Sequence, residues 1–187
     1  LNKRFIINLL SRYKKTSIVV NCAASLKPKT ANDFFVNCHL PKVLEDFSHK
    51  NKIKFIHVST LNILVKERLD KYSISKKIGE EKISVTKSTI LRLPLIYQKK
   101  NNQFAPQGEL KLFFTYINLI KIPLYPFIYP GSIYNPIDVK SACMSIHSLF
   151  KKKNNQIINL QGKKIFSAFK LFELICAQNN KACFKIH

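Results

Sequence analysis

The chain has 187 residues, of which 46% are hydrophobic and 11% aromatic, so it can build the core of a folded domain. Its 32 basic and 10 acidic residues give a formal net charge of +22, but nearly all the basic residues are lysines scattered along the sequence. Proteins that read bases and phosphates use the bidentate fork of arginine, so this pattern indicates a compositional bias and no nucleic-acid partner. No apolar stretch approaches the ~18 residues of a membrane span, so we expect no membrane partner either.

Cysteine and glycine usage argue against two kinds of site. The five cysteines form no Cys-x-x-Cys pair and the histidines do not lie at metal-ligand spacing from them, so we expect a cytoplasmic, metal-free protein. Cys22 and Cys38 lie in apolar or helical stretches, where a buried, reduced thiol is the ordinary interpretation. Only four glycines occur and no two are close together, so the chain contains no Gly-rich phosphate loop.

The first half of the chain alternates between two kinds of pattern. Apolar positions at helical spacing predict helices, and continuous apolar runs predict strands buried on both faces of a parallel sheet. The predicted elements alternate between helix and strand over Lys3–Tyr13, Ser17–Ala24, Asn32–Ser48, Ile53–Val58, a helix from Tyr72, and Thr89–Leu93. In the Tyr72 helix we assign the inner face to Ile74, Ile78 and Val85. Helices covering a parallel sheet place ligands beyond the carboxyl ends of the strands.

The second half is more varied in composition. Its predicted elements are a polar loop Gln98–Gly108, a helix Glu109–Ile122, a helix from the N-cap candidate Asp138 to Phe150, a strand Gln156–Leu160, a helix Phe166–Ala177 and a strand Ala182–Ile186. In the helix after Asp138 we expect Ala142, Ile146 and Leu149 to point inward. This half is expected to form a smaller cap over the ends of the strands.

One pair of residues can carry proton chemistry. Tyr72 and Lys76 lie four residues apart, so a helix starting near Tyr72 places both on one face, one turn apart. A neighbouring cation stabilises phenolate and lowers a tyrosine pKa toward the working pH. The chain has 7 tyrosines and many lysines, so one such pair is expected by chance. The alternative is therefore a solvated helix face on which Lys76 pairs with Glu80.

Six short segments follow one another in the order found in a known enzyme superfamily. This order favours proton chemistry at Tyr72 and Lys76 over a solvated helix face. The set resembles the extended short-chain dehydrogenase/reductase superfamily of sugar-nucleotide epimerases, dehydratases and reductases, and within it the dehydrorhamnose-reductase-like members. The segments are Val19-Val20-Asn21-Cys22-Ala23-Ala24, Val36-Asn37, Phe55-Ile56-His57-Val58-Ser59-Thr60, Tyr72-Ser73-Ile74-Ser75-Lys76 with Gly79-Glu80, Leu91-Arg92-Leu93-Pro94-Leu95-Ile96-Tyr97, and Asn135-Pro136-Ile137-Asp138-Val139.

The resemblance implies an α/β fold. This is a Rossmann-like doubly wound parallel sheet, lacking its N-terminal strands, with a small C-terminal α/β cap. It also implies a partial NAD(P)-binding core over residues 1–100, and a substrate-cap portion over residues 101–187 that is interleaved with the last core elements. The expected cofactor is NAD or NADP, and the expected substrate is a nucleotide-linked sugar. A homodimer is a further expectation.

The resemblance also implies residue roles, position by position. Tyr72 would be the acid/base, Lys76 would hold the nicotinamide ribose and lower the Tyr72 pKa, and Thr60 would hydrogen-bond the substrate oxygen, with Ser59 the weaker candidate for that last role. The other positions implied to contact the cofactor, at or beyond strand ends, are Asn21, Ala23, Ala24, Pro94, Leu95 and Ile96.

Two departures from the family pattern bear on function. The first strand, its Gly-rich turn and the acidic residue for the adenosine ribose are missing, so we expect the sequence to be a fragment lacking its amino-terminal βαβ unit. Only eleven residues separate Thr60 from Tyr72, and Leu64 stands where a Tyr-Gly pair is common. The alternative is a catalytically inactive binding or structural subunit of the same fold. Nucleic-acid binding, a third hypothesis, rests on charge alone.

Overall fold

The computed structural model describes residues 3–13, 15–65, 70–100, 103–106, 124–128, 133–152, 156–178, 180 and 182–186. The chain divides into two units, one formed by Leu1–Leu93 with Ile146–Leu160 and the other by Pro94–Ser145 with Gln161–His187. The helix predicted over Glu109–Ile122 lies outside the described residues.

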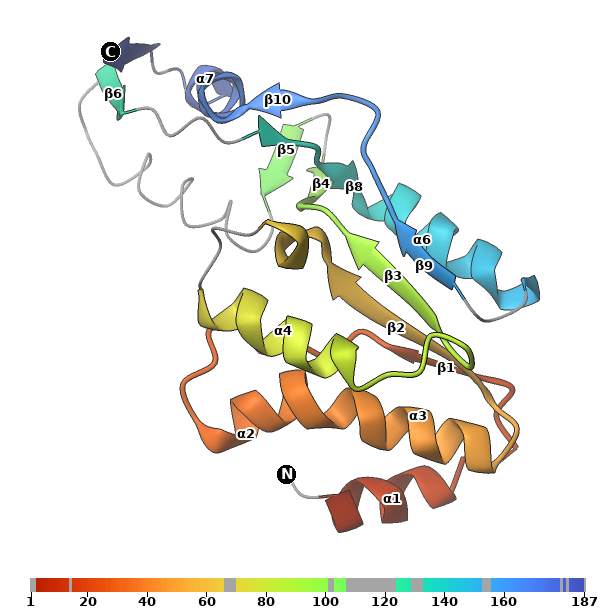
Figure 1. Cartoon of the computed structure of the whole chain (residues 1–187). Coiled ribbons are helices and arrows are strands. Elements are labelled where there is room, and N and C mark those ends of the chain that lie inside the picture. Colours follow the sequence, from red (N-terminus) through yellow and green to blue (C-terminus); the bar gives the residue numbers. More distant parts are fainter. Residues whose placement is uncertain are drawn as a thin grey trace. The chain divides into compact units, whose positions relative to one another are not determined.

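The first unit is built from one layer of strands and helices packed against it (Figure 1). Its elements are α1 (Lys3–Ser11), β1 (Ile18–Asn21), α2 (Ala31–Phe34), η1 (Phe35–His39), α3 (Leu40–Lys50), β2 (Lys54–Thr60), η2 (Leu61–Leu64), α4 (Lys71–Glu81), β3 (Thr89–Leu93), the end of α6 (Val139–Ser148), η3 (Leu149–Lys151) and β9 (Gln156–Asn159).

The four strands of this unit form one sheet in the order β1-β2-β3-β9, and every neighbouring pair is parallel. In register, Asn21 at the end of β1 lies beside His57, and Thr60 at the end of β2 lies beside Leu93. The parallel α/β sheet predicted from the apolar runs is therefore confirmed. Parallel strands bring their carboxyl ends to one edge, which is where ligands bind in such sheets.

Helices α3 and α4 pack on one face of this sheet (Figure 1). Phe55, Ile83 and Ile90 form a buried cluster there, joined by Val19 and Leu44. A second cluster of Ile6, Leu40 and Val43 packs α1 against α3. These clusters explain the apolar periodicity of the first half of the chain, because each helix buries one stripe of side chains.

The helix predicted over Asn32–Ser48 contains a wider turn in its middle. Residues Phe35–His39 form a π-helix in which the Leu40 N–H bonds to the Phe35 carbonyl, five residues back. An α-helix would need a donor at position 41 for the Asn37 carbonyl, but Pro41 has no N–H. The Asn37 carbonyl is directed at α4 instead, where a Cβ built on Gly79 would lie only 2.0 Å from it. Only glycine allows the two helices to approach this closely.

The inner face predicted for α4 is wrong. Ile74, Ile78 and Val85 are 42%, 39% and 37% exposed. The face that α4 buries carries small and polar residues, which are Ser73, Ser75, Lys76, Gly79 and Glu80. The close approach at Gly79 leaves no room for large apolar side chains, so the buried face is made of residues that fit a narrow gap and can hydrogen-bond across it.

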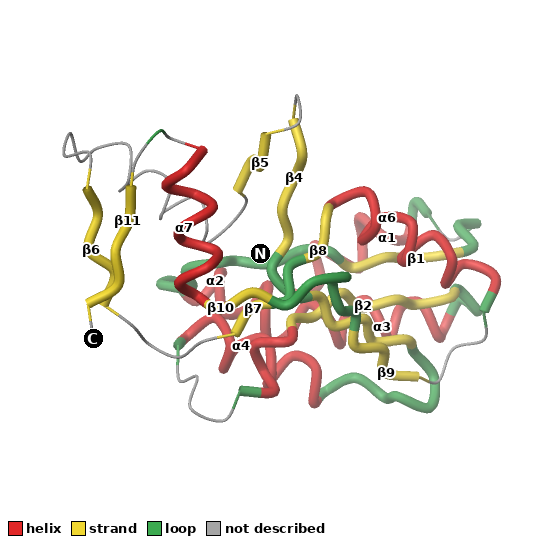
Figure 2. The backbone as a smooth tube through the Cα atoms, turned by 90° about the horizontal axis from the view of Figure 1, so that it is seen from above, coloured by secondary structure: helices red, strands yellow, loops and turns green. Residues whose placement is uncertain are grey.

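Among the described residues, the second unit contains short strands and the helices α6 and α7. Its elements are β4 (Ile96–Lys100), β5 (Gln103–Pro106), β6 (Leu124–Ile128), β7 (Ile133–Tyr134), β8 (Ile137–Asp138), most of α6, β10 (Phe166–Ser167), α7 (Ala168–Gln178) and β11 (Ala182–Ile186). β4 lies between β5 and β8, β10 pairs with β7, and β11 pairs in parallel with β6 (Figure 2).

Two sequence predictions meet different outcomes in this unit. The polar loop predicted over Gln98–Gly108 is wrong in part, because β4 and β5 form an antiparallel pair there. The N-cap predicted at Asp138 is confirmed, since its carboxylate accepts the Ser141 N–H at 3.0 Å and the Ser141 hydroxyl. This capping lowers the pKa of Asp138 below its ordinary value.

Candidate active site

The carboxyl ends of β1 and β2 place predicted site residues at one edge of the first sheet. Thr60, the last residue of β2, is buried, and its Oγ1 accepts the Asn62 N–H at 3.2 Å as the N-cap of η2. The Thr60 hydroxyl therefore still has its own proton to donate. Ser59 is also buried, and its Oγ has no hydrogen-bond partner among the described residues.

Helix α4 brings the predicted pair of proton-transfer residues to this part of the unit. The helix begins after Asp70, whose carboxylate accepts the Ser73 N–H at 2.9 Å and the Ser73 hydroxyl at 2.7 Å. Tyr72 is half-buried in the first turn, and Lys76 follows one turn later. The N-cap therefore fixes where both side chains leave the helix.

Lys76 does not belong to a solvated helix face, as the alternative interpretation required. It is 2% exposed, and its Nζ donates to the Val58 carbonyl at 2.9 Å, two residues before the end of β2. Burial lowers the pKa of Lys76 to about 8, while the charges of Glu80 and Cys22 act in the opposite direction. At neutral pH the site therefore holds a mostly protonated ammonium group against the end of β2.

Glu80 does not form an ion pair with Lys76 but pairs with Arg92 of β3. The Arg92 Nε donates to the two Glu80 carboxylate oxygens at 2.9 and 3.2 Å, and its Nη2 also contacts Oε1. Both side chains are largely buried. This bidentate pair ties the second half of α4 to the sheet and keeps a negative charge one turn from Lys76.

Asn37 is a residue whose structural role the sequence analysis missed. Its buried side-chain amide accepts the Ser25 N–H at 2.9 Å, donates to the Ser25 carbonyl at 2.8 Å, and donates to the Ser75 hydroxyl at 2.9 Å. One side chain thus joins the loop after β1, the π turn and α4. The only sequence signal was its place in the Val36-Asn37 pair, to which no role was attached.

The three residues predicted to line a cofactor at the end of β1 differ in exposure. Ala23 and Ala24 are exposed. Asn21 is buried, its Oδ1 accepts the Ala23 N–H at 3.1 Å, and its Nδ2 lies 3.0 Å from His57 Nδ1. The Asn21 side chain is therefore engaged within the protein and shapes the turn that presents the two alanines.

Pro94, Leu95 and Ile96 open the second unit directly after β3. The Leu95 carbonyl accepts the Ile137 N–H at 2.9 Å, and Ile96 begins β4, which pairs with β8. Their predicted contact with a cofactor stays a prediction.

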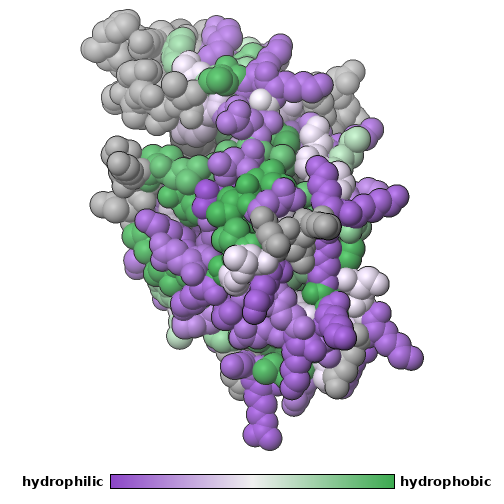
Figure 3. Space-filling view, turned by 45° about the vertical axis from the view of Figure 1, so that its right-hand side comes forward, coloured by the Kyte–Doolittle hydropathy of each residue, from purple (hydrophilic) through white to green (hydrophobic). Residues whose placement is uncertain are grey.

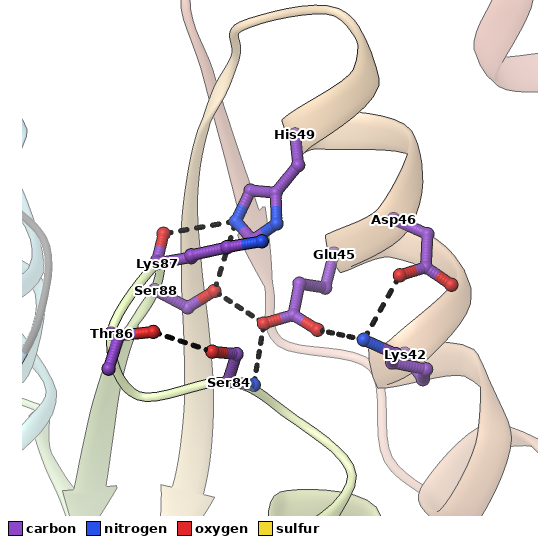
Figure 4. Close-up of polar contacts among 8 residues, drawn as sticks. All are labelled: Lys42, Glu45, Asp46, His49, Ser84, Thr86, Lys87 and Ser88. Carbon is purple, nitrogen blue, oxygen red and sulfur yellow. Dashed lines mark hydrogen bonds and ion pairs between the residues drawn. The ribbon is translucent and has the colours of Figure 1, made fainter.

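A second polar cluster joins α3 to the loop before β3, and it resembles a hydrolytic triad only in composition (Figure 4). Glu45 is buried and accepts the Ser84 N–H, the Ser88 hydroxyl and the Lys42 ammonium at 2.7–2.8 Å. The Ser88 proton thus goes to Glu45. His49 Nε2 lies 3.0 Å from the Lys87 carbonyl, so it must carry a proton and cannot act as a base toward Ser88. The cluster anchors the loop before β3 to α3.

The cysteine prediction holds for one residue of two. Cys38 is buried and burial raises its pKa, whereas Cys22 is exposed. Neither forms a disulfide. Within the described ranges, no group of three or more His, Cys, Asp or Glu side chains could hold a metal ion.

Hydrophilic side chains spread over much of the face drawn in Figure 3 and do not gather in one patch, in line with the scattered lysines. Among the helices of the described residues, none is long and apolar enough to cross a membrane.

Several solved structures have the same fold as this chain. The dTDP-4-dehydrorhamnose reductase from Bacillus anthracis str. Ames, in complex with NADP, superposes with a TM-score of 0.76 at 16% identity over 99% of this chain and 69% of that one. The UDP-glucose 4-epimerase from Thermotoga maritima, with UDP-glucose, gives 0.72 at 17% identity over 100% and 69%. The chain shares their fold. The Bordetella bronchiseptica enzyme WbmH, in complex with NAD+, gives 0.73 at 15% identity over 100% and 67%.

These structures confirm the Rossmann-like α/β fold that was predicted from six short segments. No protein-family model matches the sequence, and no match is found among curated proteins.

Proposed function

We propose that this chain contributes the proton-transfer residues of an NAD(P)-dependent epimerase, dehydratase or reductase that acts on a nucleotide-linked sugar. The observation that carries the proposal is the buried Lys76 ammonium, held on the Val58 carbonyl one helical turn from Tyr72 and beside the strand that ends in Thr60. Burying a cation costs free energy, so the burial of Lys76 near the carboxyl ends of the parallel strands supports a catalytic role for it. Solved enzymes of this fold contain NADP, NAD+ or UDP-glucose.

The residues around this edge fit the nicotinamide end of such a cofactor. Ala23 and Ala24 are small and exposed at the end of β1, so a flat ring system can approach the backbone there. Lys76 has three N–H donors, and among the described residues only the Val58 carbonyl takes one, which leaves donors for ribose hydroxyls. A bound nicotinamide would supply or accept the hydride.

The protein's own part in the reaction is the movement of one proton. Tyr72 would give a proton to the sugar oxygen as a carbonyl is reduced, or take it as a hydroxyl is oxidised. The Lys76 charge would stabilise the phenolate form and so lower the pKa of Tyr72. Thr60 would donate its hydroxyl proton to the same oxygen and hold it in place.

The test replaces Tyr72 with phenylalanine and measures turnover of NADH and NADPH with a panel of dTDP- and UDP-linked sugars. General acid–base catalysis contributes about 10²–10⁴-fold, so Tyr72→Phe should lower kcat by at least about 100-fold and leave cofactor binding intact. Tyr13→Phe is the matched control, because Tyr13 is 58% exposed in the turn that follows α1.

Two results would contradict the proposal. Full activity in Tyr72→Phe would remove the proposed acid/base. A wild-type protein that turns over no nucleotide sugar would favour the inactive binding or structural subunit of the same fold. The predicted homodimer is checked separately by light scattering on the same samples.

A further inference from the structure

His57 is buried in the middle of the first sheet, in a position the proposed chemistry does not use. It is 0% exposed on β2 and lies directly beside Asn21 of β1 in the strand register. Its ring stacks on Phe55 of the same strand, with centroids 6.5 Å apart. A wholly apolar side chain would satisfy this packing, so the imidazole calls for a separate explanation.

The hydrogen bonds around Asn21 determine which nitrogen of His57 carries the proton. The Ala23 backbone N–H can only donate, so the atom it meets at 3.1 Å is the Asn21 side-chain oxygen. The Asn21 amide nitrogen must then face His57 Nδ1, 3.0 Å away, and it can only donate. Nδ1 is therefore an acceptor, and the proton of the neutral imidazole lies on Nε2.

The surroundings of His57 keep it neutral. Burial and the nearby Lys76 charge both lower the pKa of His57 well below its ordinary value. A proton on Nδ1 would meet the Asn21 NH₂ group, so the neutral form is also the only one that fits the hydrogen bond. His57 Nε2 has no hydrogen-bond partner among the described residues, which is a free-energy cost that packing alone does not explain.

We propose that His57 is a positioning residue that holds the Asn21 amide by accepting its NH₂ group and thereby fixes the turn Asn21–Ala24. If the amide were reversed, its NH₂ would face the Ala23 N–H, and the turn would lose its hydrogen bond. By accepting from the amide nitrogen through Nδ1, His57 holds the amide with its oxygen toward the Ala23 N–H. Because this turn presents Ala23 and Ala24 at the cofactor edge, the effect on binding rests on the proposed function, whereas the effect on the turn does not.

The tautomer is measured first, on the full unliganded chain. Imidazole nitrogen NMR spectra at neutral pH should show His57 with Nε2 protonated and Nδ1 unprotonated, with the signals assigned by comparison with His57→Asn. A proton on Nδ1 would overturn the proposal, because the ring could not then accept from Asn21.

Two matched variants test the positioning itself. In His57→Asn the side-chain oxygen replaces Nδ1 as acceptor, and His57→Leu removes the acceptor while keeping apolar volume. Amide hydrogen exchange at Ala23 should become roughly three- to ten-fold faster in His57→Leu and stay within about two-fold of wild type in His57→Asn, as expected for one neutral hydrogen bond. Equal effects in both variants would reduce His57 to a packing residue and refute the proposal. If His57→Leu does not fold, the proposal is decided by amide hydrogen exchange at Ala23 in His57→Asn and by the His57 tautomer of the wild type.

Cofactor binding gives the functional measurement, with NADH and NADPH fluorescence as probes. The dissociation constant should rise roughly three- to ten-fold in His57→Leu and be restored by His57→Asn. Binding that is weakened equally in both variants would contradict the link between the turn and the site. If the wild type binds neither nucleotide, the proposed function fails, and the exchange and tautomer measurements still decide whether His57 positions the turn.

Discussion

The close approach of α4 to the π turn can be tested with one added methyl group, in Gly79→Ala. In an ordinary helix interior this change is stabilising by about 1 kcal/mol, because alanine has the higher helix propensity. Here the new Cβ would lie 2.0 Å from the Asn37 carbonyl oxygen, 3.1 Å from its carbon and 3.4 Å from Pro41 Cγ. The first two atoms are backbone, so no side-chain rotation relieves the contact.

The sign of the stability change in Gly79→Ala follows from comparing the gain in helix propensity with the cost of overpacking. Overpacking a tight interior costs about 1–3 kcal/mol, and more where backbone must move, so this contact belongs at the upper end of that range. Subtracting the propensity gain leaves a net destabilisation of about 2 kcal/mol. The shift of α4 should also lengthen the Asn37–Ser75 hydrogen bond, now 2.9 Å, and so disturb the turn that carries Tyr72.

The assay is urea unfolding followed by far-UV circular dichroism. Gly79→Ala should lower the midpoint without changing the slope, and Lys77→Ala, at an exposed neighbouring position of the same helix, should change the free energy of unfolding by no more than about 0.5 kcal/mol. A Gly79→Ala protein as stable as wild type, or more stable, would refute the close contact and with it the explanation for the polar inner face of α4.

Three further predictions concern charge and capping. Glu80→Gln leaves the Arg92 guanidinium without its anionic partner and should destabilise the protein by about 2–3 kcal/mol in the same urea assay, with Arg92→Met in that background recovering part of the loss. Asp138→Ala removes the N-cap of α6 and should cost about 1 kcal/mol in thermal unfolding, whereas Asp138→Asn should cost little. The pKa of His57 is lower in the folded chain than its ordinary 6.5, so the folded state should lose stability as the pH falls below that value, by at most about 1.4 kcal/mol per pH unit, and His57→Leu should flatten this slope between pH 6.5 and 5.

The sequence alone predicts the strands that carry continuous apolar runs. β1, β2 and β3 were found because they read as such runs, even in β1, where Ile18, Val19 and Val20 are only partly buried. The β4–β5 pair was missed because its polar residues carry no such signal, and a two-stranded ladder is held by backbone groups that every sequence possesses.

The α4 error has a different cause. The periodicity argument assumes that a helix buries its largest apolar residues, and so selects Ile74 and Ile78. The helix instead buries Ser75 and Gly79, because the neighbouring π turn comes too close for anything larger. That closeness depends on a carbonyl left without a donor by Pro41, which is a three-dimensional consequence that no periodicity in α4 itself encodes.

The roles predicted for the site residues stay predictions, and the structure adds how two of these residues are held. Lys76 was singled out by its spacing from Tyr72, and the structure buries it against the Val58 carbonyl. The predicted contact between Asn21 and a cofactor stays a prediction, and the structure shows that the Asn21 side-chain oxygen accepts the Ala23 N–H and so holds the turn. Whether a residue acts directly or through its neighbours depends on side-chain direction, which a resemblance of short segments does not contain.

The order β1-β2-β3-β9 has a consequence for how the chain acquires its structure during synthesis. The first three strands are neighbours both in sequence and in the sheet, and β1 and β2 are each followed by helices that pack on the sheet, so the three strands can assemble as soon as Leu93 has left the ribosome. β9 is added only when Gln156 arrives, on the open side of β3. We therefore expect nascent chains ending near residue 100 to resist proteolysis already, with the edge of β3 as their most aggregation-prone surface until the last strand covers it.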